Sequence, residues 1–559
     1  MVSPLILVVS GQHADFLRDE FSRYDRDYDV RSATSSAGAL TLLQQARTGG
    51  VPIALIVQDG DLPDAHPLEA FSDWRSVAPT ARRVIAAHFE RFLDQAVELR
   101  PGLAKGKYDA YLLMPRGVRD EEFHGAITEL LADWGATAVA PEVVSLKIVS
   151  GPGVRLTSEI REYAERMGMP ARVYAPDSPE GEELIASFAA EHGSPPALPL
   201  VLTARGDLLS PSSVREVAAV FYGAPSQIDV SEVVDLAVVG AGPAGLAAAV
   251  YGASEGLSTV VLESEAIGGQ AGTSSMIRNY LGFPRGISGM RLAQRARNQA
   301  LRFGTRFFTG WEVTATSVED AADGSGPVHV LHTDGGDVRA RSVVIATGVA
   351  YRKLGVEALE SLVGLGVHYG SAMSAARELE GAHVIVVGGG NSAGQAALHL
   401  ARFADSVTIL VRRDSLAETM SDYLIHEIAF NPRVTVRTHG RVVDGGGDGR
   451  LEWVTVEDVT SGARDRVAVQ GLFLLLGAAP HCDWVPEAVS RDERGFVLTG
   501  RDVPCEQWDD GVPPANLATS APGVFAVGDI RSGSMKRVAS ASGEGASVVP
   551  LVHAYLARG

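Results

Sequence analysis

The chain has 559 residues, of which 46% are apolar, and a formal net charge of −19. This length predicts about three to five domains, and the apolar content is enough for several buried cores. Nucleic acids and anionic membranes bind basic surfaces. Because this chain is strongly acidic, neither is expected as a partner.

The cysteine content and the hydropathy of the chain indicate the cellular compartment. No run approaches the ~18 apolar residues of a membrane span, and the first ten residues lack the positive region of a signal peptide. The two cysteines, Cys482 and Cys505, are isolated, which argues against a disulfide framework and against a metal site of Cys/His spacing. We therefore expect a cytoplasmic protein without a bound metal.

Residues 1–133 alternate short apolar strands with polar helical stretches, with strands expected at 5–9, 53–57, 83–87 and 110–114. This pattern predicts a doubly wound parallel sheet. Residues 55–64 resemble the phosphoacceptor strand of response-regulator receiver domains, with Asp59 in the aspartyl position. Ser10, Ala87 and Met114 stand where that family has an acidic residue, a hydroxyl and a lysine. We expect a pseudo-receiver with an inert Asp59, serving interaction or dimerisation.

A second small α/β region is expected at 143–223, between linker-like stretches at 135–141 and 224–233. It resembles a thioredoxin-like fold, in which 197–201 is similar to the loop that carries a cis-proline. Thioredoxins need a cysteine at the N-terminus of their first helix, where the helix dipole lowers the thiol pKa. The corresponding turn, 150–158, contains no cysteine, so this region should not exchange disulfides.

The first of two glycine fingerprints follows an apolar strand at 235–239 and opens a helix. Its glycines provide a tight turn, close approach of backbone to a pyrophosphate, and packing of helix on strand. The pyrophosphate then lies on the N–H groups at the positive end of the helix. The next strand, 258–262, ends in an acid that can accept hydrogen bonds from a ribose. The predicted dinucleotide-binding residues are Gly240, Gly242, Pro243, Ala244, Gly245 and Glu263.

The second fingerprint follows the strand 383–387, and its predicted binding residues are Gly388, Gly390, Asn391, Ser392 and Ala393. The next strand, 406–411, ends in Arg412 and Arg413. Arginine forks match a 2′-phosphate, so this site should prefer NADPH over NADH.

Residues 234–559 resemble the thioredoxin reductase family from end to end. Beyond the fingerprints, the resemblance is carried by Gly268, Gly269, Gln270, Asn279, Ala346, Thr347, Gly348, Gly528, Asp529, Arg537, Val538 and Ala539. It implies FAD held by these residues, NADPH as second cofactor, and a homodimer. It also implies a split FAD-binding domain, 234–349 and 472–559, around an NADPH-binding domain at 350–471. In that family the inserted domain rotates, here about strands near 348–352 and 472–476.

The expected fold class of the whole chain is α/β. A receiver-like doubly wound domain and a thioredoxin-like domain precede two Rossmann-like domains of thioredoxin reductase type, one for FAD and one for NADPH.

The chain departs from that family at its redox-active CxxC. Residues 366–373 occupy this place, and Ser371 cannot replace a thiol because disulfide exchange requires a thiolate. His368 and Tyr369 are the candidate catalytic residues, since a histidine there could pass a proton to the flavin or to a bound acceptor. Alternatively, both side chains fill the space of the missing disulfide.

The expected reaction is hydride transfer from NADPH to FAD and on to an unidentified small-molecule or small redox-protein acceptor, without an internal disulfide. Three alternatives stay open. They are a thioredoxin or other disulfide reductase using cysteines supplied in trans, a ferredoxin-type reductase, and a flavin-based redox sensor read out by the two N-terminal regions.

Overall fold

The chain divides into two units. Unit 1 comprises Met1–Glu142, Ala375–Arg441 and Asp458–Ala463, and unit 2 comprises Val143–Ser374, Val442–Glu457 and Arg464–Gly559. The computed structural model describes residues 3–104, 106–117, 120–138, 144–228, 232–274, 276–320, 326–370, 376, 378–482 and 484–558.

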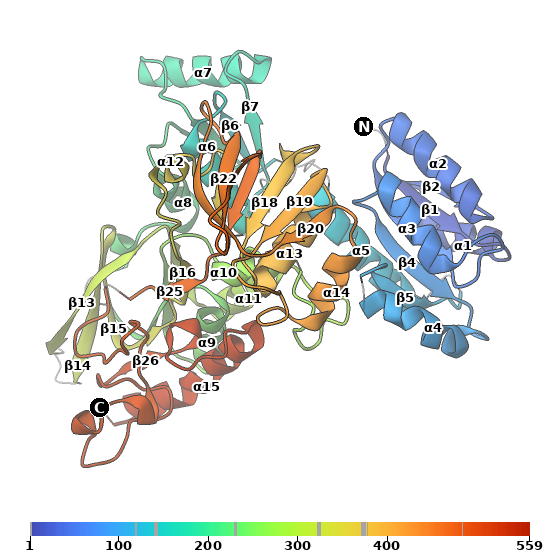
Figure 1. Cartoon of the computed structure of the whole chain (residues 1–559). Helices are drawn as coiled ribbons and strands as arrows, with labels where there is room; N and C mark the ends of the chain where they lie inside the picture. The colour runs from blue at the N-terminus through green and yellow to red at the C-terminus, as the bar shows by residue number, and fades with distance from the viewer. Residues whose placement is uncertain are drawn as a thin grey trace. The chain divides into compact units, whose positions relative to one another are not determined.

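Unit 1 begins with a five-stranded parallel sheet of order β2-β1-β3-β4-β5, a doubly wound order. The N-terminal module that contains it covers residues 3–138. Its elements are β1 (Leu5–Val9), α1 (Ala14–Glu20), β2 (Asp29–Ala33), α2 (Ser36–Thr48), β3 (Ile53–Asp59), α3 (Pro67–Val77), β4 (Arg82–Ala87), α4 (Phe92–Ala104), β5 (Ala110–Leu113) and α5 (Glu121–Ala138). Buried side chains of α2, α3 and α4 cover one face of the sheet, and those of α1 and α5 cover the other (Figure 1).

The four strands expected in this region are confirmed, but β2 was not foreseen. It is a half-exposed edge strand with polar residues at alternate positions, so it lacks the apolar run of its neighbours. The linker expected from residue 135 is wrong over its first residues, because α5 continues to Ala138. Gly135 costs this helix about 1 kcal/mol, which burial of Leu130, Leu131 and Trp134 outweighs.

The second part of unit 1 carries the second fingerprint. Its strands run parallel, with β18 beside β19 and β19 beside β20. The elements are β18 (His383–Val387), α13 (Asn391–Leu400), β19 (Ser406–Leu410), α14 (Asp422–Phe430) and β20 (Val434–Arg437). We call residues 378–441 the second-fingerprint segment.

Unit 2 begins with a second module, residues 144–223, built on a four-stranded sheet of order β7-β6-β8-β9. Its elements are β6 (Leu146–Val149), α6 (Arg155–Arg166), β7 (Ala171–Tyr174), α7 (Pro179–His192), β8 (Leu200–Thr203), β9 (Leu208–Leu209) and α8 (Val214–Tyr222). The expected order of strand, helix, strand, helix and strand is confirmed, and the Leu198–Pro199 peptide bond is cis as expected.

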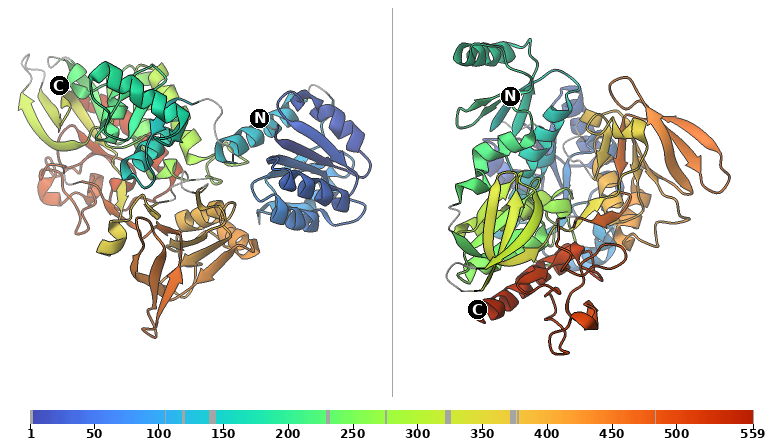
Figure 2. Two further views of the ribbon diagram at one scale, coloured as in Figure 1. Left: turned by 90° about the horizontal axis from the view of Figure 1, so that it is seen from above. Right: turned by 90° about the vertical axis from the view of Figure 1, so that its left-hand side faces the viewer.

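The largest sheet of unit 2 joins two distant stretches of chain. Its order is β12-β11-β10-β15-β14-β13, and β26 pairs with β15. The elements are β10 (Val233–Val239), α9 (Pro243–Ser254), β11 (Thr259–Glu263), α10 (Gly269–Gly272), α11 (Gly289–Arg302), β12 (Arg306–Thr309), β13 (Val313–Asp320), β14 (Pro327–Thr333), β15 (Gly336–Ile345), β26 (Val524–Ala526) and α15 (Val538–Leu556). The long helix α15 runs beside α9 (Figures 1 and 2).

Short strands connect the rest of unit 2. β16 (Val349–Tyr351) pairs antiparallel with β25 (Ala478–Pro480), close to the strands expected as hinges, and β17 (Val367–Tyr369) pairs parallel with β24 (Gly471–Leu474). The other elements are α12 (Glu357–Glu360), β21 (Gly440–Gly446), β22 (Trp453–Asp458) and β23 (Arg464–Ala468). Within the described ranges, no helix has the length and apolar character needed to cross a membrane.

Candidate functional site

The first fingerprint forms a tight turn between β10 and α9. Gly240 has a φ of +103°, and a Cβ there would lie 2.5 Å from the carbonyl oxygen of Ala346. A Cβ at Gly245 would lie 1.9 Å from the carbonyl oxygen of Gly240, so helix and strand approach this closely only because both residues lack side chains. At Gly242 a Cβ would meet no described atom within 4 Å. The turn is therefore tightly packed at Gly240 and Gly245, whereas the space beside Gly242 is free of described atoms.

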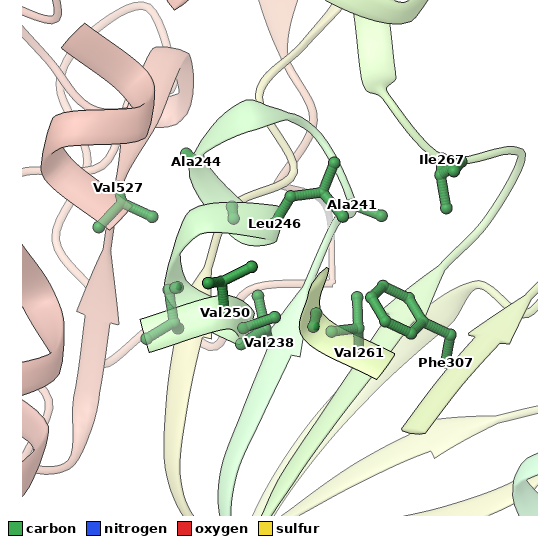
Figure 3. Close-up of a cluster of buried hydrophobic side chains, with 14 of the residues drawn as sticks. Val238, Ala241, Ala244, Leu246, Val250, Val261, Ile267, Phe307 and Val527 are labelled. Carbon is green, nitrogen blue, oxygen red and sulfur yellow. The ribbon is translucent and has the colours of Figure 1, made fainter. Parts of the chain in front are cut away.

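Helix α9 presents its N-terminus to this open space. Gly242 is its N-cap and Pro243 its first residue, and no side chain of the described residues caps it. Backbone N–H groups of an uncapped first turn can bind an anion such as a pyrophosphate. Apolar side chains hold the turn in place, with Ala241, Ala244 and Leu246 packed over Val238 and Val261 (Figure 3).

Glu263 lies beside the turn, at the end of β11. Its carboxylate accepts hydrogen bonds from the backbone N–H of Ala241 at 2.7 Å and of Glu265 at 2.9 Å. Burial raises the pKa of Glu263, against these two hydrogen bonds. A buried acceptor fixed at this point can bind the hydroxyls of an adenosine ribose.

The loop at 267–270 lies against the same turn. The N–H of Gly268 donates to the carbonyl oxygen of Ala241 at 2.8 Å, and the amide of Gln270 donates to that of Val349 at 2.5 Å. A Cβ at Gly269 would lie 3.2 Å from the Cα of Gly242. Gly268 and Gly269, predicted from the sequence to bind FAD, therefore lie beside the first fingerprint, and Gln270 contacts β16.

An arginine from the second module contacts this loop, and no motif in the sequence pointed to it. Arg166, the last residue of α6, donates to the carbonyl oxygens of Ala266 at 2.7 Å and Gly269 at 3.5 Å. It also pairs with Glu265 at 3.1 Å.

The predicted second flavin motif lies on the other side of α9. A Cβ at Gly528 would lie 2.9 Å from the Cβ of Ala244, so the turn after β26 contacts the start of α9. Burial raises the pKa of the adjacent Asp529, while Lys536 lowers it. The structure brings Asp529 and the first fingerprint together around one helix N-terminus.

Two charged residues missed by sequence reasoning fix that turn. Glu544, in α15, accepts a hydrogen bond from the N–H of Gly528 at 2.7 Å and binds Arg531 through both oxygens, at 3.1 and 2.7 Å. In the sequence, Glu544 is marked only by its place between Gly543 and Gly545. Gly545 brings α15 close to α9, because a Cβ there would lie 2.1 Å from the carbonyl oxygen of Ala244.

The remaining predicted flavin-side residues are spread around this site. Thr347 donates from its hydroxyl to the carbonyl oxygen of His481 at 2.7 Å, and Asn279 is exposed. Arg537 is the N-cap of α15, and Val538 and Ala539 form its first turn, which has no side-chain cap among the described residues.

The second fingerprint, in unit 1, repeats the features of the first. Gly388 has a φ of +145°, and Gly390 is the N-cap of α13, whose first turn is capped by no side chain that the structure describes. A Cβ at Gly390 would meet no described atom within 4 Å, so this turn is also open to a ligand. Asn391 turns its side-chain oxygen to the N–H of Ser421 at 2.7 Å. Ser392 and Ala393 continue the first turn of α13.

Arg412 and Arg413 follow β19 and Val411, and both are exposed. Arg413 pairs with Glu418 at 3.0 Å. Two guanidinium groups at this point of a βαβ unit can bind a 2′-phosphate.

The two candidate catalytic residues have different surroundings. The Tyr369 hydroxyl donates to Glu360 at 2.5 Å and accepts from the N–H of Leu354 at 2.7 Å. Burial, with Glu360, raises the pKa of Tyr369 to about 12. His368 stacks on Phe473 with ring centroids 4.9 Å apart. Both hydrogen bonds of the tyrosine are used in holding neighbouring chain, which favours its space-filling interpretation. Ser371 lies outside the described residues.

Both cysteines are free thiols. Cys482 is buried and its thiol donates to the carbonyl oxygen of Gly495 at 3.0 Å, while Cys505 is exposed in a short helical turn, Cys505–Gln507. Within the described part of the chain, no group of three or more His, Cys, Asp or Glu side chains is arranged to hold a metal ion.

In the N-terminal module, Asp59 is buried at the end of β3. Its carboxylate accepts from the Ser10 hydroxyl at 2.7 Å and lies 3.0 Å from Nδ1 of His13. The His13 ring stacks on that of His88, with centroids 4.9 Å apart.

More than half of the chain is similar to known proteins. The family model "Pyridine nucleotide-disulphide oxidoreductase" matches residues 234–545. The chain is 34% identical over 331 residues to a thioredoxin reductase of Peptoclostridium acidaminophilum, a match that covers 58% of this chain and 97% of that one. It is 33% identical to a thioredoxin reductase of Mycolicibacterium smegmatis, over 56% and 93% of the two chains.

Solved structures give a matching result. A Lactococcus lactis thioredoxin reductase in its FR conformation aligns with a TM-score of 0.51 and 28% identity, over 58% of this chain and 99% of that one. A T. acidophilum thioredoxin reductase aligns with a TM-score of 0.50 and 28% identity, over 57% and 98%.

Proposed function

The chain belongs to the pyridine nucleotide-disulphide oxidoreductase family, and on that premise we propose that it passes electrons from NADPH through FAD to an acceptor outside the chain, with no internal disulfide between them. The class itself is established: this is an NADPH-dependent flavoprotein oxidoreductase with a thioredoxin reductase-like, Rossmann-type α/β fold, and its cofactors are FAD and NADPH. The proposal concerns the path of the electrons after the flavin.

The cysteine inventory carries this proposal. Thiol–disulfide exchange needs a thiolate and a second sulfur within reach. The chain has two cysteines in all, and one of them is buried with its thiol engaged by Gly495. The other, Cys505, is an exposed single thiol. Neither arrangement supplies a redox-active pair.

The roles of the chain's own residues follow from the two open turns. The N–H groups beside Gly242 and Gly390 bind the two pyrophosphates, Glu263 binds the FAD ribose, and Arg412 binds the 2′-phosphate of NADPH. When bound, NADPH supplies a hydride and FAD accepts it. The protein orients the two cofactors and surrounds them with fixed dipoles.

The decisive experiment uses a Cys482→Ser, Cys505→Ser double variant. We expect NADPH to bleach its flavin without oxygen as fast as in the wild type, and turnover with a small-molecule electron acceptor to be retained. Loss of turnover with bleaching intact would show that a cysteine of this chain carries electrons. Absence of bleaching in the wild type itself would contradict the reductase function.

A second candidate function is reduction of a disulfide protein that brings its own thiols. The names of the similar proteins favour it, since they are called thioredoxin reductases. Adding oxidised thioredoxin to the double variant with NADPH separates the two. Formation of free thiols would support this candidate, and their absence beside continued turnover with a small molecule would support the first.

The preference for NADPH is tested at Arg412. Replacing it with alanine removes a charged fork for the 2′-phosphate, so Arg412→Ala should raise KM for NADPH on the order of tenfold. KM for NADH, which lacks that phosphate, serves as the internal control and should stay unchanged. An equal rise in KM for NADPH and for NADH would mean that the Arg412 guanidinium does not bind the 2′-phosphate.

We propose that the two N-terminal regions take no part in phosphoryl or thiol chemistry. The doubly wound order of the first sheet supports a receiver-like fold, and hydrogen bonds from Ser10 and His13 occupy the carboxylate of Asp59. The cis Leu198–Pro199 bond supports a thioredoxin-like second module, which contains no cysteine. A homodimer is part of the same proposal, and its mass in solution tests it.

A further inference from the structure

Within unit 1, the N-terminal module contacts the second-fingerprint segment through a cluster of charges. Arg402 follows α13, and its guanidinium donates to the carbonyl oxygen of Thr80 at 2.9 Å. Thr80 lies two residues before β4, whose first residues are Arg82 and Arg83. The contact therefore joins stretches that are more than three hundred residues apart in sequence.

On the module's side, two arginines and two carboxylates are already paired. Arg82 binds Asp133 and lies 3.5 Å from Asp109, and the backbone N–H of Arg83 donates to Asp109 at 2.8 Å. Burial opposes ionisation of Asp109, but Arg83 and Arg82 lower its pKa below the usual range. Arg402 adds a third guanidinium, whose pKa burial lowers to about 9, so it stays charged at neutral pH.

A second contact lies at helix α14. A Cβ at Gly106 would lie 2.4 Å from Cδ of Glu427, so the buried Glu427 packs directly on the module's backbone. The same glycine's carbonyl oxygen accepts from Arg75 at 3.4 Å. Beside it, Nζ of Lys107 lies 4.3 Å from the ring centroid of Phe430, at the end of α14.

Both helices that the module contacts begin at the dinucleotide loop and end at the module. At the first end, Asn391 begins α13 and accepts a hydrogen bond from Ser421, the N-cap of α14. At the other end, Arg402 lies just beyond the last turn of α13, and Phe430 is the last residue of α14. A ten-residue helix is about 15 Å long, so the module binds at the opposite end from the nucleotide and leaves the loop accessible.

We propose that the N-terminal module is permanently docked on the C-terminal ends of α13 and α14, and that it moves with the second-fingerprint segment as one body. Opening this contact would break the charge-assisted hydrogen bond from Arg402 to the carbonyl oxygen of Thr80 and separate Glu427 from the backbone at Gly106, so the docked arrangement is costly to open. The inference rests on contacts within unit 1 and does not depend on the electron acceptor.

The first test is amide hydrogen exchange in the full-length, FAD-loaded protein. Arg402→Ala should speed exchange on the order of tenfold or more in residues 78–83, 106–109 and 427–430, with flavin retention unchanged. His426→Ala, an exposed position on α14, is the matched control and should leave these peptides unchanged. Unaltered exchange in the folded Arg402→Ala protein would overturn the proposal.

A covalent test probes the same docking at the second contact, independently of Arg402. Gly106→Cys with Glu427→Cys, in the Cys482→Ser, Cys505→Ser background, should form a disulfide on oxidation, because the two side chains start from adjoining positions. If the parts move together, the cross-linked protein should be reduced by NADPH as fast as its uncross-linked form.

Failure to cross-link, or flavin reduction lost only in the cross-linked form, would contradict permanent docking. If the uncross-linked form were also inactive, the proposed function would fail, while the cross-link would still report on docking.

Discussion

At the scale of single residues, the first fingerprint uses its three glycines for different purposes. Gly240 and Gly245 are surrounded by backbone, whereas Gly242 faces open space. The sequence pattern contained all three, and their distances show which ones serve packing and which one serves the ligand. The same division gives a pair of variants with opposite signatures.

Gly245→Ala should lower the stability of the protein whether or not FAD is present, because its Cβ would overlap the carbonyl oxygen of Gly240. Gly242→Ala should leave the melting temperature of the FAD-free protein unchanged and weaken FAD binding on the order of tenfold or more, since the methyl group occupies the pyrophosphate's space. Thermal unfolding and FAD titration measure the two effects. A stable Gly245→Ala protein with normal FAD affinity would refute the packing argument.

At the scale of elements, α15 and the turn after β26 act as one support for the flavin side of the site. Glu544 joins them by binding both the Gly528 N–H and Arg531, and these charged groups are mostly buried. Gly545 allows α15 to approach the carbonyl oxygen of Ala244, so the support reaches the start of α9.

Glu544→Gln should therefore destabilise the protein by on the order of 2 kcal/mol, because Arg531 loses its carboxylate partner. It should also weaken FAD binding by loosening the turn that carries Asp529. The matched control is Glu255→Gln, which removes an exposed ion pair of the same helix α15, from His553 to Glu255 just after α9, at 3.2 Å. Exposed pairs contribute little, so denaturant unfolding should separate the two variants. Equal free energies of unfolding for the two variants would mean that Glu544 does not stabilise the turn after β26.

At the scale of the whole molecule, the two N-terminal modules belong to different units. The first packs with the second-fingerprint segment, and the second packs with the flavin side of unit 2. In unit 2 the Tyr163 hydroxyl meets that of Thr309 at 2.9 Å, and Arg297 binds the hydroxyl of Tyr222 at 2.5 Å. The second module therefore contacts the large sheet and α11 of unit 2 through hydrogen bonds between side chains.

Arg166 gives this arrangement a measurable consequence. Since it holds the carbonyl oxygens of the 267–270 loop, Arg166→Ala should speed FAD dissociation on the order of tenfold. Arg155→Ala is the control, because that residue lies on the same helix α6, is exposed, and pairs with Glu159 on its own helix. Fluorescence of released FAD follows the rate. Equal release from both variants would mean that the second module does not support the flavin loop.

The local part of the site was determined by the sequence. Gly240, Gly242, Gly245 and Gly390, the acid at 263 and the absence of a CxxC could all be identified there, because tight turns, strand periodicity and thiol chemistry depend on residues close together in the chain. Most strands followed for the same reason, and β2 and the end of α5 differed where edge position and burial outweighed local pattern.

The tertiary structure decided which charges meet. Glu544 with Arg531, Arg166 with the flavin loop, Tyr369 with Glu360 and Arg402 with the module are each ordinary polar residues on a helix or strand. Nothing in a local pattern specifies the partner of such a side chain, because the partner comes from another element and is fixed only when the apolar faces have packed. The chain's sequence therefore specified two glycine-rich turns that each open a helix, and packing decided which parts of the protein support each of them.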